Sequence, residues 1–197
     1  MLIAAGKIIA SIYQVKETSG DKPEPVSLQE PGKDFVFVDD QSKALTKAIG
    51  DITPGKTTHY YSYGNFNLVR LMLHLMKQTG PVHAFMTSYS FSQKSIEAIQ
   101  RQIEMMNFLS FKVIVDNRVR SLSPRPFQML IQSFDYRCSS IHAKVALLWN
   151  DKWNISIVTS QNATDNPKLE RGTIFTDKAV FDFDLNALIK EYERGNL

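Results

Sequence analysis

Between residues 58 and 134, strand-like runs alternate with amphipathic helical stretches, and this alternation limits the possible folds most strongly. The runs at 58–64, 81–90 and 111–116 are aromatic, apolar or β-branched, which is typical of strands. The stretches at 65–80, 92–110 and 123–134 carry apolar residues at helical spacing or open on proline. Such an order favours a sheet with helices packed against it, and so an α/β fold.

Two further strand-like runs, 141–149 and 153–161, are joined by the turn-forming residues "NDK". This pattern predicts an antiparallel hairpin. A strand at 171–177 and a helix over 178–197 complete the predicted order. Because strand–helix alternation is followed by a hairpin, we expect a mixed sheet with helices on both faces, an α/β/α sandwich.

The N-terminal segment "MLIAAGKIIASIYQVK" is interpreted as a strand or a pair of strands rather than as a signal peptide. Lys7 interrupts its apolar run, no basic region precedes it, and it is too short to span a bilayer. Residues 16–34 are rich in proline, glycine and charge and predict a long mobile loop, and 35–40 predict a short strand. We expect one domain over residues 1–197, without a membrane anchor and located in the cytoplasm.

The formal net charge of +3 permits an anionic partner without requiring one. The charge is uneven, since residues 101–144 hold seven Lys/Arg against three Asp/Glu, whereas the segment after Gly172 holds three against five. A single cysteine, Cys138, excludes an intramolecular disulfide and a cysteine-rich zinc site. The four histidines, at 59, 74, 83 and 142, lack the paired spacing of metal ligands, so neither a metal nor a cofactor is expected.

Five polar residues between 142 and 170 are spaced so that they can converge. His142 and Lys144 are two positions apart on a predicted strand and therefore share a face, and the same holds for Ser160 and Asn162 on the next strand. The hairpin would place the two pairs side by side, and Glu170 follows after a polar loop. An imidazole, an ammonium, a hydroxyl, an amide and a carboxylate would then meet at one end of the sheet.

This set of groups suits a phosphate. Lys144 can supply positive charge without a metal, and Ser160 and Asn162 can act as neutral donors to phosphoryl oxygens. His142 can attack phosphorus or transfer a proton, and Glu170 can hold the other ring nitrogen.

The motif H-A-K at 142–144, followed by T-S-Q-N at 159–162 and by Glu170, resembles the H-x-K…[GS]-S-x-N signature of the phospholipase D superfamily. The resemblance implies an α/β/α sandwich and a metal-independent phosphodiesterase. It implies four catalytic residues, which are His142, Lys144, Asn162 and Glu170. It also implies two substrate-binding residues, Ser160 and Thr159.

Members of that superfamily build one active site from two such motifs. One histidine becomes a covalent phosphohistidine, and the other acts as general acid and then as base. Here only one copy is present, because the weak second candidate around His83 has Phe85 at the lysine position. The resemblance therefore implies a homodimer. The similarity to the single-motif members of the superfamily further implies an endonuclease that acts on DNA or RNA.

The sequence departs from the family pattern at two positions. Trp149 stands where the motif has an aspartate, with Asp151 two residues further on, and Thr159 replaces the usual glycine. These departures support one alternative, a catalytically inactive nucleic-acid-binding module of the same fold. The other alternative is a hydrolase of phospholipids or small phosphodiesters with the same chemistry.

The other basic and aromatic residues singled out in the sequence are expected to have structural roles. Arg118, Arg120 and Arg125 are expected to be solvated loop residues rather than DNA contacts. The aromatic cluster "HYYSYGNF" is expected to pack against the core and cover a sheet edge, with base stacking by Tyr61 or Tyr63 as the alternative.

Overall fold

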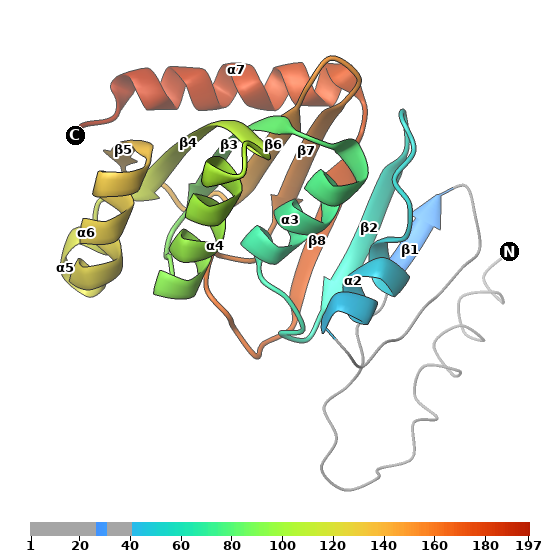
Figure 1. Cartoon of the computed structure of the whole chain (residues 1–197), viewed down its shortest axis with the longest axis horizontal. Coiled ribbons are helices and arrows are strands. Elements are labelled where there is room, and N and C mark those ends of the chain that lie inside the picture. Colours follow the sequence, from blue (N-terminus) through green and yellow to red (C-terminus); the bar gives the residue numbers. More distant parts are fainter. Residues whose placement is uncertain (1–26, 31–40) are drawn as a thin grey trace, which may run out of the picture.

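The computed structural model describes residues 27–30 and 41–197, and in this part eight strands form one sheet (Figure 1). The strand order is β1-β2-β8-β7-β6-β3-β4-β5. The strands are β1 (Ser27–Glu30), β2 (Thr57–Ser62), β3 (Val82–Ser88), β4 (Phe108–Asp116), β5 (Asp135–Ser139), β6 (Val145–Trp149), β7 (Asn154–Thr159) and β8 (Glu170–Phe175). The pairs β3–β4 and β4–β5 are parallel and the other neighbours are antiparallel, so the sheet is mixed, as predicted.

Helices cover both faces of the sheet, which confirms the α/β/α sandwich. Helices α3, α4 and α6 lie on one face, and α7 crosses the other (Figure 1). The described helices are α2 (Gln41–Ile49), α3 (Leu68–Thr79), α4 (Gln93–Glu104), α5 (Val119–Leu122), α6 (Pro124–Ser133) and α7 (Lys178–Arg194). None of these helices is both long and apolar enough to cross a bilayer.

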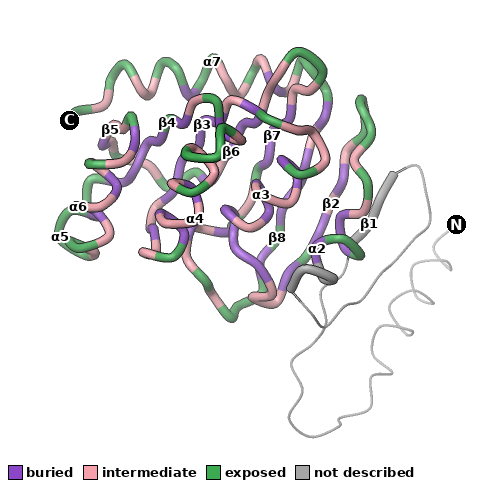
Figure 2. The backbone as a smooth tube through the Cα atoms, viewed as in Figure 1, coloured by how far each residue is buried: buried purple, intermediate pink, exposed green. Residues whose placement is uncertain are grey.

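The central strands are buried almost throughout, because helices cover them on both sides (Figure 2). The larger apolar cluster lies between the sheet and the layer of α3, α4 and α6. A smaller cluster under α7 contains Phe85, Ile114 and Leu147 from the sheet and Phe181 and Leu188 from the helix. Alternating side chains of β3 and β4 therefore enter different cores, which fixes their register.

One edge of the sheet collects the ends of several elements. Strands β3, β4 and β7 end there, and β6 and β8 begin there, because β6 is antiparallel to both β3 and β7. We call this the carboxyl edge. Helices α3 and α4 also begin there, each with a side-chain cap: Asn67 Oδ1 accepts from Arg70 N at 3.0 Å, and Ser92 Oγ accepts from Ser95 N at 3.2 Å.

The predicted hairpin of β6 and β7 is confirmed, with Val145 opposite Val158 and Trp149 opposite Asn154. Asn150 closes its turn, since Oδ1 accepts from the backbone N–H groups of residues 152 and 153 at 2.9 and 3.0 Å. The strand predicted over 141–149 begins only at Val145. His142 and Lys144 therefore lie in the segment that leads into β6.

Other differences concern short elements at the margins. The predicted loop at 16–34 contains β1, which pairs with β2, and the predicted helix at 92–110 ends at Glu104, before β4 begins at Phe108. Strand β5 and helix α5 were not predicted, because the sequence "DYRCS" is largely polar and "VRSL" forms barely one turn. The strands predicted at 1–16 and 35–40, and the rest of the 16–34 loop, lie outside the described residues.

A buried tyrosine links β2 to the residues that follow β7. Tyr60 is 1% exposed, and its hydroxyl lies 2.6 Å from Gln161 Oε1 and 3.1 Å from Thr159 Oγ1. Burial raises the pKa of Tyr60 well above its usual range. Its register partner on β8 is Gly172, where a Cβ atom would overlap the tyrosine ring. A glycine is thus required opposite Tyr60 for steric reasons.

We expect Gly172→Ala to lower the free energy of unfolding by about 1–3 kcal/mol, because the added methyl group displaces the buried Tyr60 ring. Urea denaturation would measure this. In a Tyr60→Ala background the same substitution should cost less, because the overlapping ring is gone. An equal cost in both backgrounds would show that the clash is not its cause.

Candidate active site at the carboxyl edge

The segment that carries His142 and Lys144 is held by the strands on either side. Thr87, near the end of β3, donates from Oγ1 to the carbonyl of Ala143 at 2.8 Å and accepts from Val145 N at 3.0 Å. On the other side, the backbone N–H of Thr159 donates to the carbonyl of Lys144 at 3.0 Å. The H-x-K segment is therefore fixed between β3 and β7 at the carboxyl edge.

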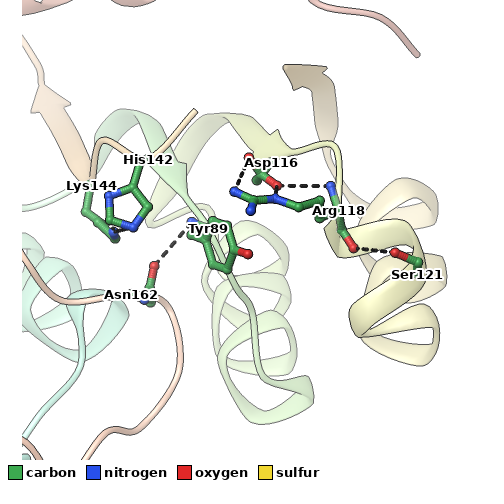
Figure 3. Close-up of polar contacts among 7 residues, drawn as sticks. All are labelled: Tyr89, Asp116, Arg118, Ser121, His142, Lys144 and Asn162. Carbon is green, nitrogen blue, oxygen red and sulfur yellow. Dashed lines mark hydrogen bonds and ion pairs between the residues drawn. The ribbon is translucent and has the colours of Figure 1, made fainter. Parts of the chain in front are cut away.

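His142 and Lys144 lie together, as their spacing predicted (Figure 3). The Lys144 Nζ atom is 3.3 Å from Nε2 and 3.4 Å from Nδ1 of the imidazole. His142 is exposed, whereas Lys144 is only 8% exposed. The imidazole can thus meet a substrate at the surface while the ammonium group supports it from below.

Burial lowers the pKa of Lys144, because desolvation disfavours the charged ammonium form, and the negative charge of Glu170 opposes this effect. Glu170 is itself buried, with 7% exposure. The two residues therefore form an electrostatically coupled buried pair behind the histidine.

Asn162 is held by the backbone of its neighbours. Its Oδ1 accepts from Tyr89 N at 3.2 Å, and its carbonyl accepts from Leu68 N at 3.2 Å (Figure 3). The next residue, Ala163, has its carbonyl bonded to Ser92 N at 3.0 Å. The loop after β7 is thus docked on the start of α3 and on the segment leading into α4. Among the described residues the Asn162 Nδ2 group has no partner, so it is available to an external acceptor.

Glu170 is placed near Lys144, but its hydrogen bonds differ from the prediction. One carboxylate oxygen accepts from the Ser160 hydroxyl, and the other accepts from Asn166 Nδ2 at 2.7 Å. Ser160 Oγ in turn accepts from Arg171 N at 3.0 Å. Within the described part of the chain the predicted bond from Glu170 to His142 is absent. Here Glu170 acts on Lys144 by its charge.

Thr159, predicted to bind substrate, has its hydroxyl in contacts within the protein. The Oγ1 atom accepts from Gln161 N at 3.1 Å and lies 3.1 Å from both the Tyr60 hydroxyl and the Arg171 carbonyl. The hydroxyl therefore helps to shape the segment that presents Ser160 and Asn162. Its role in substrate binding stays a prediction.

The structure adds three residues that sequence reasoning did not assign to the site. The Tyr89 ring lies 5.7 Å from the His142 ring, centroid to centroid, and the Arg118 guanidinium carbon lies 4.7 Å from the Tyr89 centroid. Asp116 accepts from Arg118 Nε at 2.8 Å and from Arg118 N at 3.0 Å. Burial alone would raise the pKa of Asp116, but the hydrogen bonds from Arg118 hold this pKa below its usual range.

The positions of Tyr89 and Asp116 in the sequence could have indicated that they lie at the site. Tyr89 and Asp116 stand at the ends of two predicted strands, which the structure shows to be parallel, and the ends of parallel strands meet at one edge of a sheet. Arg118 is exposed, as predicted, but its guanidinium is fixed between Asp116 and Tyr89 and is not simply a solvated loop group. No group of three or more His, Cys, Asp or Glu that could hold a metal ion occurs in the described residues.

Comparison with solved structures identifies the fold. The chain is similar to Nuc, a phospholipase D family member from Salmonella typhimurium, at a TM-score of 0.53 and 14% identity, over 71% of this chain and 95% of Nuc. It is equally similar to NucT from Helicobacter pylori, at 0.53 and 15% identity, over 71% and 98% of the two chains. Polyphosphate kinase from Porphyromonas gingivalis matches at 0.53 and 14% identity, over 70% of this chain and 26% of the kinase.

The fold that the resemblance of the H-x-K motif implied is thus confirmed, because the chain shares it with Nuc and with NucT. No protein-family model matches the sequence, and no curated protein matches it in a sequence comparison. At this level of identity the solved structures show the fold alone.

We expect the Lys144 ammonium to titrate below the usual lysine range, and Glu170→Gln to lower its pKa further, because the opposing negative charge is removed. NMR of labelled lysine side chains, with Lys144→Arg to assign the signal, would measure both values. Asp165→Asn, which removes an exposed carboxylate from the loop that leads to β8, is the matched control. A Lys144 pKa that stays constant or rises in Glu170→Gln would contradict the coupling.

Proposed function

We propose that this protein is a metal-independent phosphodiesterase that cleaves nucleic acid, with His142 as the nucleophile. The observation that carries the proposal is the exposed imidazole of His142 with the buried Lys144 ammonium 3.3 Å from its ring, and with Asn162 beside them (Figure 3). The fold supports it, because it is shared with Nuc and with NucT.

The chemistry follows from the groups at the edge. An unprotonated ring nitrogen of His142 attacks phosphorus, a phosphorus–nitrogen bond forms, and the bond to the leaving oxygen breaks. A second imidazole protonates that oxygen, then takes a proton from the water that attacks the phosphohistidine and releases His142. Lys144 and the free amide of Asn162 stabilise the negative charge on the phosphoryl oxygens. Glu170 favours the charged form of Lys144.

The second imidazole requires a second copy of the chain. One H-x-K motif is present, and His83 lies at the start of β3, whereas the site lies beyond its other end. We therefore propose a homodimer in which a twofold axis brings two His142 side chains to one phosphate.

His142→Asn should reduce cleavage of labelled DNA or RNA by more than about 10³-fold, because the nucleophile is lost. EDTA should leave the wild-type rate unchanged. His83→Asn, in the weak second motif, is the matched control and should stay active. Cleavage by folded His142→Asn would refute the mechanism. Binding of nucleic acid without cleavage by wild type would favour an inactive module, and hydrolysis of phospholipids alone would favour the lipid alternative.

The shared site predicts how mixtures behave. When wild-type and His142→Asn chains are co-expressed and form random dimers, activity should fall as the square of the wild-type fraction, because a mixed dimer has one imidazole. Differently tagged chains allow the composition of each preparation to be measured. A linear fall would show that each copy acts alone.

A further inference from the structure

Beside His142, the side chains of Tyr89 and Arg118 form a shelf that the proposed chemistry does not use. The Arg118 guanidinium lies 4.7 Å from the Tyr89 centroid, and the Tyr89 ring lies 5.7 Å from the His142 ring at 59°. Figure 3 shows Tyr89 between the His142–Lys144 pair and the Asp116–Arg118 pair. We call the two side chains the Tyr89–Arg118 shelf.

The shelf is held in place from below. Asp116 is 2% exposed and accepts from both the Nε and the backbone N–H of Arg118, so the guanidinium cannot swing freely. Tyr89 is fixed through its backbone, which donates to Asn162. The Arg118 side chain is nevertheless 63% exposed. A surface arginine with a buried carboxylate anchor loses little further conformational freedom on binding a ligand.

The exposed surface of this shelf has two chemical properties. A guanidinium plane over an aromatic ring offers a flat π surface on which a base can stack. The Nη groups, of which Nη2 makes one long contact of 3.5 Å with Asp116 Oδ2, can also donate to a phosphate oxygen. A nucleotide contains both a base that can stack and a phosphate that can accept. The shelf could therefore hold the nucleotide that neighbours the phosphate at His142.

We propose that the Tyr89–Arg118 shelf binds the nucleotide next to the scissile phosphate and makes the site prefer single-stranded nucleic acid. The proposal rests on the proposed function. Stacking on the shelf needs a base whose face is free, and in a duplex both faces of a base are covered by its neighbours. An unpaired base can reach the shelf without the free-energy cost of breaking a base pair and leaving the duplex stack.

The test compares three substrates with and without the shelf: a single-stranded oligonucleotide, the same sequence as a duplex, and a small aliphatic phosphodiester, which has no ring that could stack. Arg118→Ala and Tyr89→Leu should lower kcat/KM on the single strand by about tenfold to a hundredfold. They should change hydrolysis of the small diester by less than about twofold. Tyr89→Phe should keep the single-strand rate, because the ring is retained.

Arg101→Ala is the charge-matched control, because it removes one exposed positive charge from the last turn of α4, at the other end of the sheet. It should leave all three rates near wild type. An equal loss on the small diester would show that the shelf only orients His142. An equal loss on single strand and duplex, or no loss, would refute the strand preference.

Failure of the proposed function is seen separately, as the absence of wild-type hydrolysis of every substrate. Fluorescence anisotropy with the single-stranded oligonucleotide then tests the shelf alone. Weaker binding by Arg118→Ala than by Arg101→Ala supports the shelf, and equal binding by the two variants refutes it.

Discussion

The end of β3 holds the whole site together. Three consecutive residues there, all buried or half-buried, bind segments distant in the chain: Thr87 fixes the H-x-K segment, and Ser88 and Tyr89 fix the loop after β7. Ser88 accepts from Ala163 N at 3.0 Å and donates to the carbonyl of residue 90 at 2.8 Å. The relative position of the imidazole and the amide of Asn162 therefore depends on one strand end. Because β3 is an interior strand, paired with β6 and β4, and is buried on both faces, we expect its end to be among the least deformable places in the fold.

A rigid frame is needed because the charges at the edge are costly to bury. Lys144 and Glu170 are both less than 9% exposed, yet neither forms a direct salt bridge with the other in the described residues. The carboxylate is instead satisfied by Ser160 and Asn166, so it acts as a fixed charge and not as a mobile partner. Because Glu170 takes none of its protons, the ammonium, which lies 3.3 Å from His142 Nε2, keeps further donors for a ligand. That arrangement suits an anion that gains charge during reaction.

The sequence predicted those parts of the structure that depend on local spacing. His142 and Lys144 are two positions apart, and the hairpin that follows is marked by its turn, so their juxtaposition needed no tertiary information. Thr87 contacts the H-x-K segment across 56 positions, and nothing in the sequence signals that pairing. The hydrogen bonds of Glu170 could not be predicted either, because Asn166 lies on an irregular loop. Strands β1 and β5 escaped prediction because edge strands carry polar residues and lack a clear alternation.

At the two departures from the family pattern, Trp149 and Thr159, the side chains contact residues other than His142, Lys144 and Asn162. Trp149 stands at the far end of β6, roughly 13 Å from Val145 at about 3.3 Å per residue, where it stacks on His83 at 5.4 Å and packs against Phe181 of α7 at 5.8 Å. The tryptophan there packs against the apolar cluster under α7, so this position contributes to the core. Thr159 adds a hydroxyl that is hydrogen-bonded within the protein. The features that favoured an inactive module thus change the support of the site and leave its imidazole, ammonium and amide in place.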